Sequence, residues 1–464
     1  MRWQPVGLRT LFVVAVAALG LWPSAALAQQ NQNQNVPVTS GIEVDAMGVV
    51  RKKMVVDSGG MTARERIAAQ RAMATRDVLA PSKLRKISLT RLEKAILQKS
   101  GVLSEEMRFL AGLQRVRYVF YYPETKDLVI AGPAEGWAMD GFGRALGVQS
   151  GRPAVQLQDL LVALRAFPPG SAGAEMLGCS IDPTPQGLAA MQQFLRSMGS
   201  SFAAGQEQVI APRIVEGLRS SLGMQNVTVY GVSPKTHFAQ VLVEADYRMK
   251  LIGIGLEQPP IRMVSFVDRV NPSQVARNAL FRWFFIPDYN CVRMSEDGLA
   301  MELVGDGVKL VGEDEMVAEG GRRAVSGRSN MASQAFVTSF TQKYPMLAER
   351  SPVYAELRNL IDLAVAAAFV QKQDYYGKAD WKMEFFGDEQ AMPTEVFNPP
   401  KQVESTVATV WRGSRLMTPI AGGVRIEPLM AVKPENVLAD EQGNLSKLHG
   451  NARLKLGPSQ WWWD

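Results

Sequence analysis

Three side chains that take part in enzyme chemistry, Ser233, Lys235 and His237, fall within five residues of one another. Nucleophilic catalysis needs a hydroxyl held within hydrogen-bond reach of a base. The intervening Ser-Pro-Lys-Thr sequence predicts a turn that joins two strands, residues 227–232 and 238–243. Because neighbouring turn residues usually diverge into solvent, we interpret the three as turn residues and not as a catalytic group.

A Gly- and Arg-rich segment, residues 320–329, looks superficially like a loop that binds phosphate. A P-loop has four residues between its first Gly and the Gly-Lys pair. Here Gly321 and Gly327 are separated by five residues, and an arginine replaces the lysine. We interpret the segment as a connecting loop. Anion binding by its guanidinium groups stays open as the alternative, through Arg322, Arg323 and Arg328.

Metal and cofactor sites are not predicted. The chain has two histidines, which excludes a cluster of imidazole ligands. The acidic groups Glu296-Asp297 and Glu313-Asp314-Glu315 lack the alternating ligands and central glycine of a calcium loop. Glu296 and Asp297 are better explained as turn formers.

The two cysteines, Cys179 and Cys291, exclude a disulfide-dense scaffold. In an oxidising compartment they could pair, and the alternative is two buried free thiols. Both possibilities stay open, because the sequence does not fix the distance between them.

Three consecutive indoles, Trp461, Trp462 and Trp463, come just before Asp464. One helix or strand cannot bury all three. They suit a recognition element for a partner or a membrane surface. Docking onto the protein's own core is the alternative that remains.

The first residues predict an export signal. Arg2 and Arg9 precede an apolar run, residues 11–22, which is too short for a membrane span of about 20 residues. Small residues then occupy the positions that signal peptidase requires, so we expect cleavage between Ala28 and Gln29. The mature protein is expected to be periplasmic or secreted, without a transmembrane helix.

Composition agrees with a folded protein. The chain has 464 residues, 47% of them hydrophobic and 21% charged, which excludes a wholly disordered chain. The net charge of +6 is too small to indicate nucleic acid. We expect a signal peptide (1–28), a flexible leader (29–50), a basic helical region with a hairpin and a helix (51–170), an α+β unit with a meander (171–318), a helix pair with strands (319–431) and an irregular tail (432–464).

Hydrophobic periodicity predicts an α+β fold, in which antiparallel hairpins and a β-meander alternate with helix pairs. Capping boxes at Thr62–Glu65 and Thr90–Glu93 predict two helix starts. The remaining predicted elements are a hairpin (116–130), helices (157–167, 185–198, one ending at Leu222, 332–344 and 354–372), a meander (282–313) and strands (403–411 and 424–428). The apolar stretch 360–370 carries Asp362 and is interpreted as part of a buried helix.

Residues 51–100 hold 13 Lys or Arg against four acidic residues. Such charge most often forms a solvated helix face, which is our interpretation. If the charges shared one face, the region would bind an anionic polymer or lipid head groups.

The segments GPAEGWAMD, GCSIDPTPQGL, VTVYGVSPKTHFAQVLVEADYRMKLIGIGLE, SEDGLAMELVG, LRNLIDLAVAAAFV and PIAGGVRIEP lie in this order between Gly132 and Pro428. They resemble exported planctomycete proteins assigned to a domain-of-unknown-function family, number 1598. The resemblance implies an exported α+β unit, and it brings no catalytic residue, cofactor or substrate.

Together these features predict an exported, envelope-associated protein that binds a partner, an envelope protein or an anionic polymer, and does not act as an enzyme. The alternative is a secreted hydrolase with a site of dispersed Asp, Glu, Ser and Lys residues. A pocket that gathers carboxylates with perturbed pKa values would favour the hydrolase. A flat apolar or basic patch would favour the binding protein.

Overall fold

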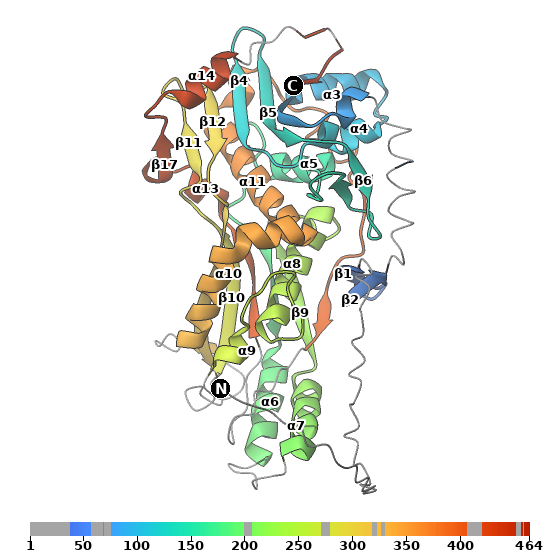
Figure 1. Ribbon diagram of the computed structural model, residues 1–464, viewed down its shortest axis with the longest axis vertical. Coiled ribbons are helices and arrows are strands. Elements are labelled where there is room, and N and C mark those ends of the chain that lie inside the picture. Colours follow the sequence, from blue (N-terminus) through green and yellow to red (C-terminus); the bar gives the residue numbers. More distant parts are fainter. Residues whose placement is uncertain are drawn as a thin grey trace, which may run out of the picture. The chain divides into compact units, whose positions relative to one another are not determined.

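Two β-sheets and the helices packed on them form the fold (Figure 1). The computed structural model describes residues 38–56, 68, 76–198, 207–270, 279–317, 323–325, 330–405, 420–451, 456–457 and 459–464. Helices and strands of mixed sheets occur throughout these residues, so the predicted α+β class is confirmed.

The larger sheet has nine strands, most of them antiparallel to their neighbours. The order across the sheet is β1 (Val38–Val44), β2 (Val49–Val56), β15 (Gln402–Glu404), β9 (Met224–Tyr230), β8 (Leu177–Pro183), β16 (Ile420–Ile426), β10 (Ala279–Pro287), β13 (Val308–Val317) and β14 (Arg323–Val325). The two parallel pairs are β2 with β15 and β16 with β10.

The smaller sheet contains the predicted hairpin of residues 116–130, which the structure confirms. Its order is β17 (Val437–Ala439), β11 (Val292–Met294), β12 (Ala300–Leu303), β4 (Tyr118–Tyr122), β5 (Asp127–Ala134), β3 (Ser82–Ser88) and β18 (Trp462–Trp463). A separate two-stranded ribbon joins β6 (Trp137–Met139) to β7 (Ala145–Gly147).

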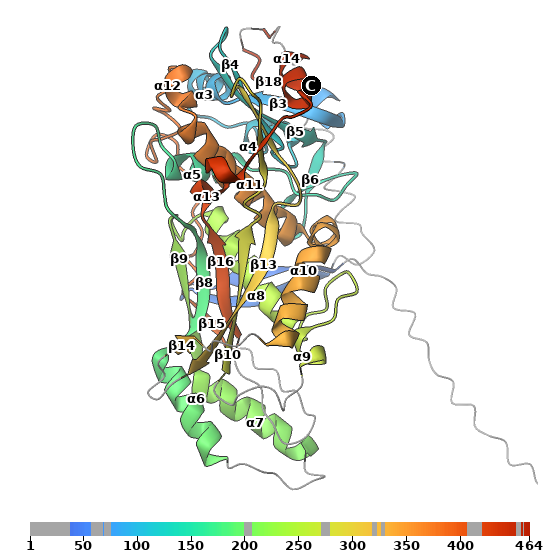
Figure 2. The same cartoon turned by 90° about the vertical axis from the view of Figure 1, so that its left-hand side faces the viewer.

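The predicted helices 157–167, 185–198, 332–344 and 354–372 and the helix ending at Leu222 are confirmed. Figure 2 shows α6 and α7 side by side beyond one end of the nine-stranded sheet. The helices are α2 (Arg76–Leu79), α3 (Leu89–Gln98), α4 (Glu105–Arg108), α5 (Leu157–Ala166), α6 (Pro185–Ser197), α7 (Glu207–Leu222), α8 (His237–Gly253), α9 (Phe266–Arg269), α10 (Met331–Arg350), α11 (Pro352–Lys372), α12 (Tyr375–Lys378), α13 (Pro428–Ala431) and α14 (Asn444–Asn451).

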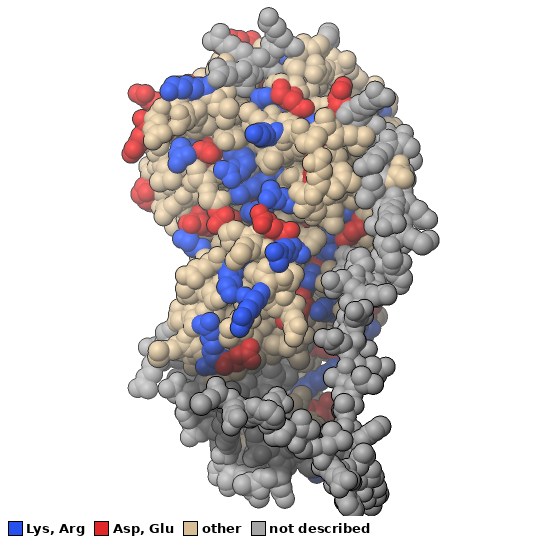
Figure 3. Space-filling model, viewed as in Figure 1, with Lys and Arg blue, Asp and Glu red and all other residues tan. Residues whose placement is uncertain are grey.

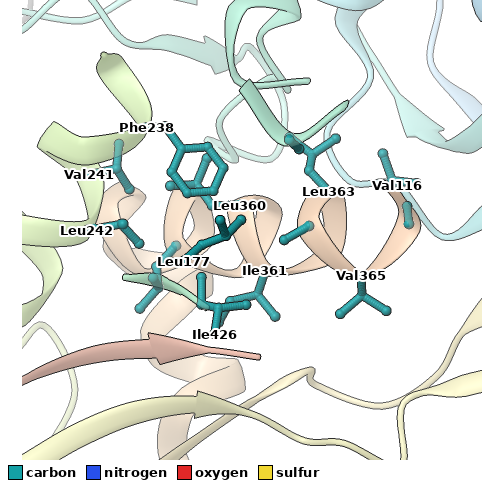
Figure 4. Close-up of a cluster of buried hydrophobic side chains, with 14 of the residues drawn as sticks. Val116, Leu177, Phe238, Val241, Leu242, Leu360, Ile361, Leu363, Val365 and Ile426 are labelled. Atoms are coloured by element: carbon teal, nitrogen blue, oxygen red, sulfur yellow. The ribbon is translucent and has the colours of Figure 1, made fainter. Parts of the chain in front are cut away.

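Helix α11 lies at the centre of the hydrophobic core, as its apolar sequence predicts. Every residue from 353 to 370 is buried. Leu360, Ile361 and Leu363 pack among side chains from α8, β8 and β16, including Phe238 (Figure 4). Because the helix is enclosed on all sides, its few charged residues need partners inside the protein.

The predicted strand 238–243 is wrong, because these residues begin helix α8. Thr236 is the N-cap, and its hydroxyl accepts a hydrogen bond from the Ala239 amide. All residues of the run FAQVLV except Gln240 are buried, so its hydrophobic pattern does not separate a strand from an enclosed helix.

The predicted meander is also wrong in its pairing, although its four strands exist. Strands β10 and β13 pair with each other in the nine-stranded sheet. The hairpin β11–β12 between them pairs instead with β4 and β17 in the seven-stranded sheet. Pairing between strands depends on packing far along the chain, which the turn residues do not specify.

The basic region 51–100 is not mainly helical in its described part. It contains β2 and β3, and β1 lies within the segment that was predicted to be a flexible leader. Of the two capping boxes, Thr62–Glu65 lies outside the described residues. The second is wrong, because Ser88 caps α3, and Glu93 instead accepts hydrogen bonds from the Trp381 indole and two backbone amides.

Five described cations of this basic region lie in separate ion pairs. Arg51 pairs with Asp45, Lys53 with Glu43, Arg91 with Asp127, Lys52 with Glu257 and Arg85 with Asp464. Figure 3 likewise shows basic and acidic side chains interspersed on one face of the protein. Among the described residues, no helix has the length and apolar character that crossing a membrane requires.

Candidate functional site

A cleft of about 230 Å³ opens where the first turns of α5, α8 and α11 meet β1 and the β6–β7 turn. Its walls combine charged, amide and aromatic side chains. The lining residues are Ile42, Phe142, Gly143, Arg144, Gln156, Gln158, His237, Gln240, Val241, Glu244, Glu356, Glu395 and Phe397.

His237, the first residue of α8, holds its ring against a carboxylate of α5. Its Nδ1 lies 2.9 and 3.1 Å from the two oxygens of Asp159, and its Nε2 lies 3.3 Å from the side-chain amide of Gln156. Burial disfavours the charged ring, but the charge and hydrogen bond of Asp159 outweigh it and raise the pKa of His237 to about 9. At neutral pH the ring is therefore an imidazolium. It donates a hydrogen bond from Nδ1 to Asp159, and it is not available as a base.

Arg144 joins two carboxylates of the cleft. Its Nη2 donates to Glu244 Oε2 at 2.5 Å, its Nε donates to Glu356 Oε2 at 3.0 Å, and its Nη1 donates to the carbonyl of Ser40 at 3.3 Å. Burial opposes the charge of Arg144, but Glu244, Glu356 and Asp140 raise its pKa. The three partners come from α8, α11 and β1, so one guanidinium ties together elements that are far apart in the sequence.

A second arginine extends the same network away from the cleft. Arg248 Nη1 donates to the other oxygen of Glu244 at 3.1 Å, and its Nε and Nη2 donate to Glu257 Oε1 at 2.9 and 2.8 Å. Lys52 of β2 lies 2.8 Å from Glu257 Oε2. The network is thus an alternating chain of cations and carboxylates beneath the β1–β2 hairpin.

Several acceptors of the cleft are not used by this network. Glu356 Oε1 and the carboxylate of exposed Glu395 make no hydrogen bond to any described residue, and Gln158 Oε1 is buried without a partner. The lining holds two cationic groups, Arg144 and His237, and three carboxyl groups, Glu244, Glu356 and Glu395. With all five ionised, the lining carries one net negative charge and is rich in acceptors.

Part of this cleft lies in a segment that is similar to a known family. Residues 179–266 match the family model described as "Protein of unknown function (DUF1598)". We call these residues the DUF1598 segment. The match is shorter than the resemblance between Gly132 and Pro428 suggests. Comparison with curated proteins and with solved structures gives no match.

The DUF1598 segment runs from β8 to the start of α9 and supplies one wall of the cleft. It contributes His237, Glu244 and, behind them, Arg248. The partners Arg144, Asp159 and Glu356 lie outside the segment. The complete cleft therefore needs chain on both sides of the DUF1598 segment.

His237 is not the solvent-facing turn residue that the sequence analysis predicted. Ser233 and Lys235 are exposed, as expected, but the ring of His237 is turned inward and is 15% exposed. The three side chains do not form a group. The cap at Thr236 explains the difference, since it begins a helix at the position where a strand was expected.

The tryptophan triplet packs on this protein, which is the second of the two interpretations of the sequence. Strand β18 pairs with β3, and Trp461 is 7% exposed. The guanidinium of Arg85 lies 4.6 Å from the centre of the Trp462 ring, whose Nε1 donates to Glu106. Both oxygens of Asp464 accept hydrogen bonds from Arg85, at 2.9 and 3.0 Å.

Cys179 and Cys291 are buried free thiols, the second of the two alternatives. Burial raises the pKa of both thiols, and for Cys291 the value reaches about 12. Neither is a nucleophile at neutral pH.

The remaining predicted residues are those of the acidic turns and of the Gly- and Arg-rich loop. Asp297 accepts hydrogen bonds from Ser295 and the Leu299 amide, which confirms that it is a turn former. The side chains of Arg322, Arg323 and Arg328 lie outside the described residues. The described residues contain no group of three or more His, Cys, Asp or Glu side chains arranged to hold a metal ion.

Sequence reasoning missed Arg144, Asp159, Glu244 and Glu356. Arg144 and Glu356 are 212 residues apart and belong to no recognisable motif. One signal was present: Glu356, like Arg358 and Asp362, is a charged residue in a mostly apolar, buried helix. A charged residue in such a helix needs a buried partner, but the pattern does not say which one.

Proposed function

We propose that this protein is exported and binds a small solute that carries an ammonium group, without converting it. The observation that carries the proposal is the excess of free acceptors in a cleft with one net negative charge. An ammonium group has three N–H donors and one positive charge. It would donate hydrogen bonds to Glu356 Oε1 and to Glu395, and it would neutralise the lining.

The walls of the cleft fit the same class of ligand. Phe142 and Phe397 line it together with the carboxylates, and aromatic faces attract organic cations. A volume of about 230 Å³ holds roughly seven or eight water molecules at about 30 Å³ each, which suits a single sugar or amino-acid unit. The position of Glu395 at the rim, where it is exposed, allows it to steer a cation inward.

Export rests on the first 28 residues, whose charge, short apolar run and small-residue site are those of a signal peptide. The compartment is thus the cell envelope or the medium. Intact mass of the exported protein tests this. A mature chain that starts at Gln29 is expected, and a mass that includes residues 1–28 would contradict export by cleavage.

The binding proposal is tested by calorimetry with matched probes. Glucosamine and glucose differ by an ammonium group in place of one hydroxyl, so glucosamine is expected to bind at least about tenfold more tightly. Binding of two further amines, 1,4-diaminobutane and ethanolamine, is measured in the same way. Equal affinity for glucose and glucosamine, or no binding of any of the three amines, would contradict the proposal.

Two variants locate the binding. Glu395→Gln removes a carboxylate that has no protein partner, so it should weaken amine binding without changing stability. Glu389→Gln is the matched control, because Glu389 is exposed and lies outside the cleft. If Glu395→Gln and Glu389→Gln bound the amine with equal affinity, the amine would bind outside this cleft.

A secreted hydrolase is the second candidate, and one observation favours it. Burial raises the pKa of Glu356, in spite of Arg144 and His237, and a carboxyl group with a raised pKa can act as a general acid. Hydrolysis of chromogenic esters or glycosides by the exported protein, abolished in Glu356→Gln but kept in Glu389→Gln, would establish this candidate in place of the first.

A further inference from the structure

Arg358 of α11 is a buried cation without a protein partner. The residue is 8% exposed, and it makes no hydrogen bond or ion pair with any described residue. Its Nε is fully enclosed and unsatisfied. A buried guanidinium is costly unless it is paired, so an unpaired one in the most enclosed helix of the protein needs an explanation.

The carboxylate that follows Arg358 along the helix, that of Asp362, is already paired with another arginine. Asp362 lies one turn further along α11, and it accepts hydrogen bonds from Arg115 at 2.6 and 3.3 Å. Burial and the charge of Arg115 lower the pKa of Arg358, and the charge of Asp362 opposes them. Arg152, which pairs with Glu349 at 3.0 Å, also lowers the pKa of Arg358. Among the described residues, the guanidinium of Arg358 is therefore left without a carboxylate of its own.

The loop that covers this cluster approaches it closely through a glycine. Gly307 has a φ of +75°, and a Cβ placed on it would lie 3.3 Å from Asp362 Oδ1, 3.5 Å from Arg115 Nη2 and 3.9 Å from Arg358 Cγ. Asp306 of the same loop is exposed and forms no ion pair within 4.0 Å with a described residue, although its negative charge raises the pKa of Arg115. The loop therefore supplies no direct partner for Arg358.

We propose that Arg358 binds an oxyanion, a phosphate or carboxylate group of a solute, with Arg115 and Arg152 contributing positive potential. Of the Arg358 nitrogens only Nε is enclosed without a partner; Nη1 and Nη2 are the pair of donors that takes two oxygens of one anion. The site is separate from the cleft of His237. Glu356 and Arg358 are two positions apart on α11, about 200° around the helix, so they face opposite sides.

The probe is inorganic phosphate, compared with chloride at equal ionic strength, and the measurement is the melting temperature. Ligand that binds only the folded protein raises it, by roughly 1–3 °C at about ten times Kd for a protein of this size. Wild type should show this rise and Arg358→Met should not. Arg108→Met is the matched control, because Arg108 is an exposed arginine on α4, and it should respond as wild type does.

Without phosphate, Arg358→Met is expected to melt at the same temperature as wild type or higher, since the variant removes an uncompensated buried charge. This result separates a binding residue from a structural one, whose loss would lower the melting temperature. Should Arg358→Met fail to fold, Arg358→Lys decides the question. It keeps the charge but not the paired donors, and it should show a smaller phosphate response than wild type.

An equal phosphate response in wild type and in the Arg358 variants would overturn the proposal, and so would a wild type that responds neither to phosphate nor to acetate. A response to acetate that exceeds the response to phosphate would keep the site and assign it to carboxylates. The outcome is independent of amine binding in the cleft, because the two sites share no residue.

Discussion

Two charged clusters lie on opposite sides of the first turns of α11, and they are constructed differently. Around Arg144, each buried cation meets a carboxylate, and Glu244 is shared by two arginines. Around Arg358, Asp362 is paired with Arg115 and Glu349 with Arg152, and Arg358 itself has no ion pair with a described residue. The first cluster joins β1, α8 and α11, so it is part of the fold. The second leaves a charge without a partner, which costs stability and is typical of a binding site.

The largest expected effect is the loss of Arg144. Arg144→Met leaves Glu244 and Glu356 as buried carboxylates with one contact fewer, and the Ser40 carbonyl without its donor. Removing one partner of a buried ion pair typically costs about 3–5 kcal/mol. We expect the free energy of unfolding, from urea titration, to fall by that amount.

Arg358→Met replaces a residue of similar burial, and it should not lower the free energy of unfolding in the same urea titration. If Arg144→Met cost less than about 1 kcal/mol, the Arg144 network would not hold the three elements together, and the contrast would be lost.

The second effect is a pH dependence of stability that comes from His237 and Asp159 in the cleft, and not from the surroundings of Arg358. The pKa of His237 is about 9 in the folded protein and close to 6.5 when unfolded. The folded state thus binds the proton more tightly, so the stabilisation is complete below about pH 6.5 and is lost as the pH rises through about 9. It amounts to on the order of 2–3 kcal/mol.

Urea unfolding at pH 6.0 and pH 9.5 measures this loss. His237→Gln cannot titrate, so its stability should fall less between these two pH values than that of wild type. An equal fall in both proteins would mean that Asp159 does not stabilise the imidazolium.

Local signals predicted much of the fold. The hairpin β4–β5, the proline-started helix α6 and the apolar helix α11 follow directly from turn residues, caps and hydrophobic periodicity. These features depend on neighbours along the chain. The strand that proved to be α8 shows the limit, because a run that is buried on all sides has no period that distinguishes helix from strand.

The candidate site could not be predicted, because its charges meet only after folding. His237 was singled out for its chemistry but was placed in solvent, and its partner Asp159 lies 78 residues away. Distances between segments decide which carboxylate pairs with which cation. A single sequence does not specify these distances.

Arg85 offers an intermediate case between the two clusters. It is fully enclosed, but it donates to four backbone carbonyls in addition to Asp464. Asp464→Asn keeps those four contacts and removes the only carboxylate bound to Arg85. We expect a loss of about 1–2 kcal/mol in the free energy of unfolding. A loss as large as that for Arg144→Met would show that backbone carbonyls do not compensate a buried guanidinium.

The smallest expected effect belongs to Arg152, at the exposed side of the Arg358 cluster. Its ion pair with Glu349 is solvent-exposed, and such pairs contribute about 0–1 kcal/mol. Arg152→Gln also removes a positive charge that lowers the pKa of Arg358. Loss of the ion pair lowers stability, and loss of a like charge near Arg358 raises it, so the two effects oppose each other. We expect a change in the free energy of unfolding of less than about 0.5 kcal/mol, together with a weaker phosphate response, because the positive potential at Arg358 falls. An unchanged phosphate response would restrict the anion site to Arg358 and Arg115.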